Sequence, residues 1–123
     1  MKPSKLELQI LALLWERGAS TAREVLENMP DGKCRAYTSV LTMLQVMFKK
    51  GLVRRTREGL ADRWRPAQPR KKILGHYFGE LTAQIFGGSP AAAVQHFLEA
   101  TKVDDAELAA IERVIRASKK GTR

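Results

Sequence analysis

The sequence predicts a mainly α protein with one small β-hairpin, divided into two parts. Three observations predict this class. Three segments with helical apolar spacing come first, a short basic hairpin pattern follows them, and three more helical stripes follow the prolines at 66 and 69. A chain of 123 residues can hold one core and a helical appendage. We therefore predict one domain over residues 1–68 and a second, helical domain over residues 69–123.

Each of the first two helices carries a start signal. Ser4 and Glu7 are spaced as a capping box, and so are Thr21 and Glu24. Gly18 marks the end of the first helix, because glycine adopts the backbone conformation that follows a helix. The apolar residues predicted to face inward are Leu6, Ile10, Leu11, Leu13, Leu14 and Trp15 in the first helix, and Val25, Leu26 and Met29 in the second.

The third helix is predicted over Ala36–Lys50, after a turn at Pro30–Gly32 and before Gly51. Its buried face has the spacing i, i+3, i+4, i+7, and the residues are Val40, Met43, Leu44 and Met47.

A hairpin is predicted next, with strands at Leu52–Thr56 and Leu60–Arg65 around a turn at Arg57–Gly59. Side chains alternate between the two faces of a strand. If Trp64 packs inward, the arginines on either side of it point outward.

Positive charge concentrates on the third helix and the hairpin. Residues 33–65 contain nine basic and two acidic residues, and so carry seven of the net nine positive charges. A pI near 10.1 favours a polyanionic partner, although a basic protein with no such partner is the plain alternative. Three helices followed by a basic hairpin match a winged helix–turn–helix domain, in which a helix enters the major groove of DNA and the wing neutralises phosphates.

Candidate DNA-contacting residues lie on the polar side of the third helix and on the hairpin. Hydroxyl groups bind phosphates or base edges, glutamine can pair with adenine, and arginine neutralises phosphate. The alternative is a solvated polar face, and for Tyr37 a half-buried position at the helix start. The predicted residues are Tyr37, Thr38, Ser39, Thr42, Gln45, Arg54, Arg55, Arg57, Arg63 and Arg65.

The last three helices carry more apolar surface than one short chain can cover. They are predicted to start near Ile73, Ser89 and Asp104. We expect their stripes to bury against a second copy of the chain, as a homodimer, with packing back onto the first domain as the alternative. The residues predicted to dimerise are Ile73, Leu74, Tyr77, Phe78, Leu81, Ile85, Phe97, Leu108, Ile111 and Ile115.

The sequence shows no pattern typical of an enzyme, a metal site or a membrane protein. No nucleophile elbow, phosphate loop or zinc-protease motif occurs, so we expect no enzyme, no cofactor and no metal. His76 and His96 lack ligand partners at suitable spacing, and Cys34 is interpreted as an incidental thiol rather than a redox switch. Met1–Ser4 leads straight into an amphipathic segment and no apolar run could span a membrane, so a cytoplasmic location without membrane insertion is expected.

The chain also resembles the penicillinase-repressor family of BlaI/MecI type. Ala36–Leu44, Lys50–Arg55 and Trp64–Pro66 carry the resemblance, with Thr21–Leu26 and Phe86–Ala91 adding to it. The resemblance implies a dimeric winged-helix repressor that binds a palindromic operator of a β-lactam-resistance or related operon. It also implies release when a protease linked to a membrane sensor cuts the dimerisation domain.

Three features depart from the family pattern. Gln45–Val46 stands where many relatives carry basic residues, so a different operator sequence is expected. His96–Phe97 aligns with the Asn–Phe bond that is cut in well-known members, which makes it the candidate cleavage site. No C-x-C pair is present, which excludes copper sensing by that route.

The leading hypothesis is therefore a sequence-specific dimeric repressor. A sequence-blind architectural DNA-binding protein, or a protein-interaction module with an incidental basic surface, remains as an alternative.

Overall fold

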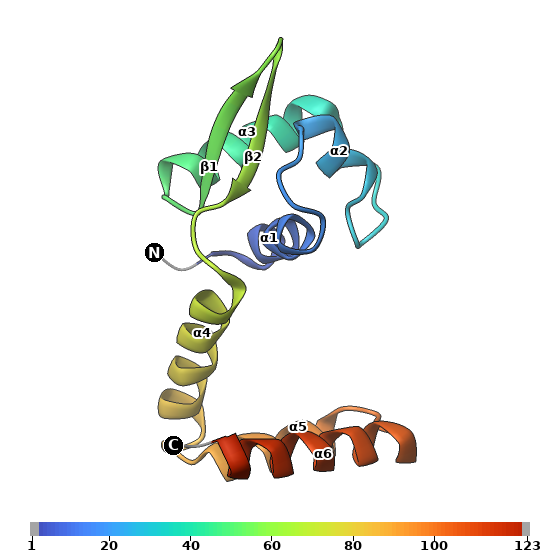
Figure 1. The fold of residues 1–123 in the computed structure, drawn as a ribbon, viewed down its shortest axis with the longest axis vertical. Coiled ribbons are helices and arrows are strands. Elements are labelled where there is room, and N and C mark those ends of the chain that lie inside the picture. Colours follow the sequence, from blue (N-terminus) through green and yellow to red (C-terminus); the bar gives the residue numbers. More distant parts are fainter. Residues whose placement is uncertain (1–2, 122–123) are drawn as a thin grey trace. The chain divides into compact units, whose positions relative to one another are not determined.

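The computed structural model describes residues 3–121, so Met1 and Lys2, on which the expected absence of a leader depends, lie outside the described residues. The chain divides into two compact units between His76 and Tyr77 (Figure 1). The first unit contains three helices and a hairpin, and the second contains helices. The predicted fold class, mainly α with one hairpin and with winged helix–turn–helix order, is confirmed.

Helices α1 (Lys5–Arg17) and α2 (Ala22–Glu27) begin at the predicted capping boxes. The Ser4 hydroxyl accepts from the Glu7 backbone N–H at 3.2 Å, and the Glu7 carboxylate accepts from the Ser4 N–H at 2.8 Å. The reciprocal pair at the start of α2 has distances of 3.1 and 2.9 Å. Gly18 ends α1 with a φ of 88°, a conformation that favours glycine.

Helix α3 (Tyr37–Lys49) matches its prediction, whereas the hairpin differs in its turn. Strands β1 (Val53–Glu58) and β2 (Ala61–Pro66) pair antiparallel, so the turn is Gly59–Leu60 and not Arg57–Gly59. Gly59 has a φ of 64°, which suits the first position of a two-residue hairpin turn of type II′. Longer strands are favoured because each added cross-strand pair satisfies further backbone groups.

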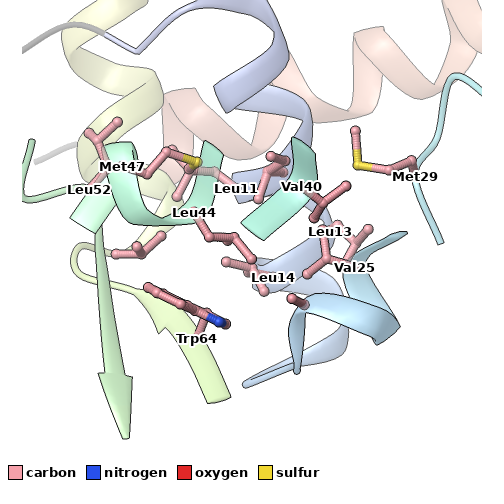
Figure 2. Close-up of a cluster of buried hydrophobic side chains, with 13 residues drawn as sticks. Leu11, Leu13, Leu14, Val25, Met29, Val40, Leu44, Met47, Leu52 and Trp64 are labelled. Atoms are coloured by element: carbon pink, nitrogen blue, oxygen red, sulfur yellow. The ribbon is translucent and has the colours of Figure 1, made fainter. Parts of the chain in front are cut away.

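The core of the first unit lies between the helices and the base of the hairpin, and Trp64 is its largest buried side chain (Figure 2). Trp64 also exchanges two backbone hydrogen bonds with Ser20, at 2.8 and 2.9 Å, which fixes β2 beside the segment before α2. Phe48 of α3 meets the indole edge to face at 6.3 Å. The buried residues are Ile10, Leu11, Leu13, Leu14, Ala22, Val25, Met29, Val40, Leu44, Met47, Leu52, Val53 and Trp64.

The chain after β2 packs on α1 through Gln68 and Arg70. The Trp15 indole N–H donates to the Gln68 carbonyl at 3.0 Å, and the Arg70 guanidinium lies 5.8 Å from the Trp15 ring. Arg70 already belongs to helix α4 (Arg70–Ile85), which crosses the boundary between the units. The ring of Trp15 therefore anchors the start of α4 to the first unit.

The second unit consists of the rest of α4 with α5 (Pro90–Ala100) and α6 (Asp105–Gly121). The Ser89 hydroxyl accepts from the Ala92 N–H at 3.0 Å and caps α5, and Asp104 caps α6 through the Glu107 N–H at 2.8 Å. Within residues 3–121, no helix combines the length and the apolar character needed to cross a membrane.

A partly buried ion pair joins α1 to the residue that follows α3. The Lys50 ammonium lies 2.9 Å from a carboxylate oxygen of Glu7, which is itself a buried side chain. Burial raises the pKa of Glu7, but the hydrogen bonds from Lys50 and from the Ser4 backbone outweigh burial and hold that pKa below its ordinary value.

Glu7→Gln is expected to lower the free energy of unfolding at pH 7 by about 1 kcal/mol, or Tm by roughly 4–8 °C. Because the folded-state pKa is depressed, this stabilisation is present above the unfolded value near 4.5 and is lost as pH falls through the folded-state pKa. Thermal melts of wild type and variant at pH 7 and pH 3 measure the effect, with the exposed Glu16→Gln as control. An equal Tm difference at both pH values would show that the ionised pair is not its source.

Candidate DNA-binding and apolar surfaces

The exposed face of α3 carries all five polar candidates that the sequence predicts for this helix. Its opposite face is buried in the core through Val40, Leu44 and Met47, and the helical repeat turns the polar residues outward. Tyr37 is 40% exposed, so its side chain is partly covered and partly open. It therefore lies between the two alternatives, a DNA contact and a half-buried position at the helix start. The exposed candidates are Tyr37, Thr38, Ser39, Thr42 and Gln45.

A cleft of about 380 Å³ separates this helix from the hairpin. It brings Tyr37 and Gln45 of α3 together with Arg57 of β1. Arg57 is 67% exposed, and its pairing with Asp62 is loose at 3.7 Å, so the guanidinium can reach an anion in the cleft. The lining residues are Thr21, Ala22, Arg23, Tyr37, Leu41, Gln45, Arg57, Leu60, Ala61, Asp62 and Trp64.

Arg54 and Arg65 lie directly opposite each other across the strands and are both exposed. Like charges at paired positions repel, and an anion between them would relieve the repulsion. Among the described residues neither arginine has an ion-pair partner. Both side chains are therefore available to an external polyanion, at the end of the hairpin away from its turn.

Arg55 and Arg63 are held more closely by the protein itself than Arg57, which pairs only loosely with Asp62. The Arg55 guanidinium lies over Phe48 at 4.5 Å and over Trp64 at 5.8 Å. Arg63 pairs with Glu58 at 2.6 Å and with Glu24 at 3.1 Å. The five arginines that the sequence groups together thus have four different environments: Arg54 and Arg65 have no ion-pair partner among the described residues, Arg57 has a loose one, Arg55 lies over aromatic rings, and Arg63 lies between two carboxylates.

Sequence reasoning missed Arg23 and Leu60. The Arg23 guanidinium lies 5.1 Å from the centre of the Tyr37 ring and lines the cleft. Its position inside the capping box of α2 was a usable signal, because the first turn of a helix next to the recognition helix can approach a phosphate. Leu60 is 96% exposed at the turn of the hairpin, and only the corrected turn position reveals it.

The loop before α3 is held by a bidentate ion pair. Both oxygens of Asp31 accept from the Arg35 guanidinium, at 2.8 and 2.6 Å, and one also accepts from the Lys33 N–H at 3.1 Å. These contacts, led by Arg35, hold the pKa of Asp31 well below its usual range. They order the approach to α3, whose N-cap residue Ala36 offers no side-chain cap. Cys34 is an exposed free thiol in this loop.

Helices α4, α5 and α6 have no buried residue among those described, despite their apolar stripes. Phe78, Ile85 and Phe97 are 64%, 66% and 52% exposed. Leu81, Leu108 and Ile115 are exposed as well, and the other predicted dimerisation residues, Ile73, Leu74, Tyr77 and Ile111, are half-buried. The unit does not bury its own apolar stripes.

An apolar groove of about 590 Å³ opens between α4 and α5 and contains Phe78, Leu81, Val94 and Phe97. A second hollow of about 590 Å³, on another side of α5, contains Leu98 and Ile115. The candidate cleavage pair, His96 and Phe97, lies inside α5, and the His96 ring packs against Phe86 at 5.6 Å. Within residues 3–121 no group of three His, Cys, Asp or Glu side chains could hold a metal ion.

Comparisons with known proteins cover both units. A family model described as Penicillinase repressor matches residues 3–117. The chain is also 35% identical, over 104 residues, to a protein called transcriptional regulator BlaI in two Mycobacterium tuberculosis strains, CDC 1551/Oshkosh and ATCC 25618/H37Rv. Each alignment covers 83% of this chain and 75% of the relative.

Proposed function

Because the chain belongs to the penicillinase repressor family, a family of transcriptional repressors rather than enzymes, we propose that it is a homodimeric repressor that binds a palindromic operator. The observation that carries this proposal is the cleft in which the polar face of α3 meets the basic hairpin. In winged helices the recognition helix reads base edges, and basic side chains around it neutralise phosphates. Binding to operator DNA would place its action in the cytoplasm.

The proposal assigns different tasks to the helix and the hairpin. Thr42 and Gln45 are exposed on α3 and carry groups that discriminate between bases. Arg57, Arg54 and Arg65 carry charge that any DNA sequence attracts. Specificity would come from the helix, and most of the affinity from the arginines.

Two copies of the chain are proposed to pair through the second unit. The apolar groove and the exposed Phe78, Ile85 and Phe97 support this arrangement, because such side chains gain free energy when a partner removes them from water. An isologous pair of DNA-binding units matches the two-fold symmetry of a palindrome.

Release from DNA is proposed to follow cleavage between His96 and Phe97 in α5, by a protease linked to a membrane sensor. The target would be a β-lactam-resistance or related operon. Supporting this, the bond lies in a helix whose side chains are mostly exposed, in a unit with no buried residue among those described. Units with few buried contacts open locally at low cost, and a helical bond must open before a protease can bind it.

Selection from a pool of random duplexes tests the function. The proposed repressor enriches an inverted repeat whose half-sites are separated by one or more helical turns of about 10–10.5 base pairs. Enrichment without a consensus would identify a sequence-blind architectural protein instead. Failure to retain any duplex at low salt would leave only a protein-interaction module.

Thr42→Ala is expected to weaken operator binding by about 1–3 kcal/mol, roughly 5- to 150-fold, with little change on random DNA. Arg57→Ala is expected to weaken binding to both DNAs by a similar factor and to reduce the slope of log K against log salt by about 0.9. Fluorescence anisotropy on both duplexes at four salt concentrations measures both effects. If the two variants lose affinity equally on both duplexes and change the salt slope equally, the helix and the hairpin do not have the separate roles proposed here.

A further inference from the structure

Arg63 joins the end of β1 and the start of α2 to β2. From its place on β2, its Nε donates to Glu58 at the end of β1, at 2.6 Å. Its Nη1 donates to Glu24 in the first turn of α2 at 3.1 Å, and to the Ala19 carbonyl before α2 at 3.2 Å. One guanidinium thus connects the outer part of the hairpin to the helix beside the cleft.

Both carboxylates beside Arg63 are in direct contact with its guanidinium, and that of Glu24 is also fixed by the cap of α2. The same Glu24 oxygen accepts the Thr21 N–H at 2.9 Å, as part of the capping box of α2. This backbone hydrogen bond lowers the pKa of Glu24, and Arg63 lowers it further. Glu58, followed by Glu24, raises the pKa of Arg63. The Nε and Nη1 donors of Arg63 are thus already used inside the protein, and a DNA phosphate approaching the guanidinium would meet two carboxylates already beside it.

The hairpin needs a brace beyond its base. Only Val53 and Trp64 are buried among its residues, and every residue of β1 from Arg54 to Glu58 is exposed. An isolated two-stranded hairpin is at best marginally stable in water. The backbone hydrogen bonds between Ser20 and Trp64 fix the position of β2 at Trp64. Arg63 is the next residue of β2 towards the turn. Its paired residue on β1 is Thr56, in the exposed part of that strand.

We propose that Arg63 is a positioning residue which, with Glu24 and Glu58, braces the wing against α2 instead of neutralising a DNA phosphate. This inference rests on the proposed DNA-binding function. A braced wing loses less conformational freedom when DNA binds, so the brace raises affinity without releasing counterions. Arg57 is loosely paired and lines the cleft, so it is the proposed phosphate contact with which Arg63 is compared.

Three variants separate a brace from a phosphate contact. Arg63→Ala should weaken operator binding about two- to fivefold and leave the salt slope unchanged, whereas Arg57→Ala reduces that slope by about 0.9. Arg63→Lys keeps the charge but cannot reproduce the fork of donors, so it should bind nearly as weakly as Arg63→Ala. The double variant Glu24→Gln, Glu58→Gln removes two negative charges and keeps the capping-box geometry. It should nevertheless bind DNA more weakly than wild type.

The same variants are measured in the full chain by anisotropy on the selected operator, and without DNA by hydrogen exchange. Backbone amides of residues 54–58 should exchange severalfold faster in Arg63→Ala than in wild type or Arg57→Ala. A salt slope reduced by about one in Arg63→Ala, tighter binding by the double variant, or unchanged exchange in β1 would overturn the brace. Absence of salt-sensitive binding by wild type would instead overturn the proposed function, and hydrogen exchange would still decide on the brace.

Discussion

Phe78→Asp is expected to make the protein monomeric and to weaken operator binding by at least about 100-fold. Phe78 is 64% exposed in the groove of the second unit, where the proposed partner copy would cover it. A carboxylate buried there would lose its hydration without gaining a partner. Two half-sites bound by separate monomers also lose the effective concentration that linkage provides. Sedimentation and anisotropy on the selected operator measure both consequences.

Ala83→Asp is the matched control for this substitution. Ala83 is exposed on α4 and does not line the groove, and helical periodicity turns it away from the apolar stripe. The control therefore introduces the same charge into the same helix without entering the proposed interface. Dimers formed by Phe78→Asp would place the interface elsewhere, and monomers formed by both variants would point to a general effect of charge on the unit.

Cleavage between His96 and Phe97 is expected to dissociate the dimer and remove the repressor from its operator. The cut would separate Phe97, Leu98 and all of α6 from α4, so the apolar surfaces of the second unit could no longer pack as one set. Truncating one buried Phe costs about 3–5 kcal/mol, and the cut removes several apolar side chains together.

Mass spectrometry of the repressor from cells treated with a β-lactam tests this release. Fragments that end at His96 and begin at Phe97 should appear when the promoter becomes active. Phe97→Leu keeps an apolar side chain in the groove and alters the scissile bond, so it should still bind the operator, at most about tenfold more weakly, but resist induction. Intact chain on an active promoter would exclude cleavage as the switch.

Local features of this fold could be predicted from the sequence. The capping boxes of Ser4 and Thr21 depend on residues three apart, and α3 follows from a repeat of apolar residues within one segment. The predicted hairpin turn begins two residues and ends one residue too early, because strand ends depend on pairing between strands and not on local composition. Gly59 belongs to the turn as predicted, but it is the first residue of the observed turn and the last of the predicted one.

Contacts across the chain could not be predicted in the same way. Arg63 and Glu24 are 39 residues apart, and nothing in the spacing of either residue indicates that they meet. Alternation along β2 placed Arg63 with Arg65 as outward charges, yet only Arg65 is without an ion-pair partner among the described residues. The apolar stripes of α4 to α6 were visible in the sequence, but no residue of these helices is buried within the described chain, so local periodicity alone does not show what would cover them.

The most direct test of the account is a nuclease footprint of the purified protein on the selected operator, titrated alongside a shuffled duplex of the same composition. We expect one protected region with two symmetric half-sites, occupied together at a single concentration, and protection of the shuffled duplex only at concentrations roughly 10³-fold higher or more. Equal, diffuse protection of both duplexes would contradict the proposal that α3 and the wing of a homodimer read a specific palindrome.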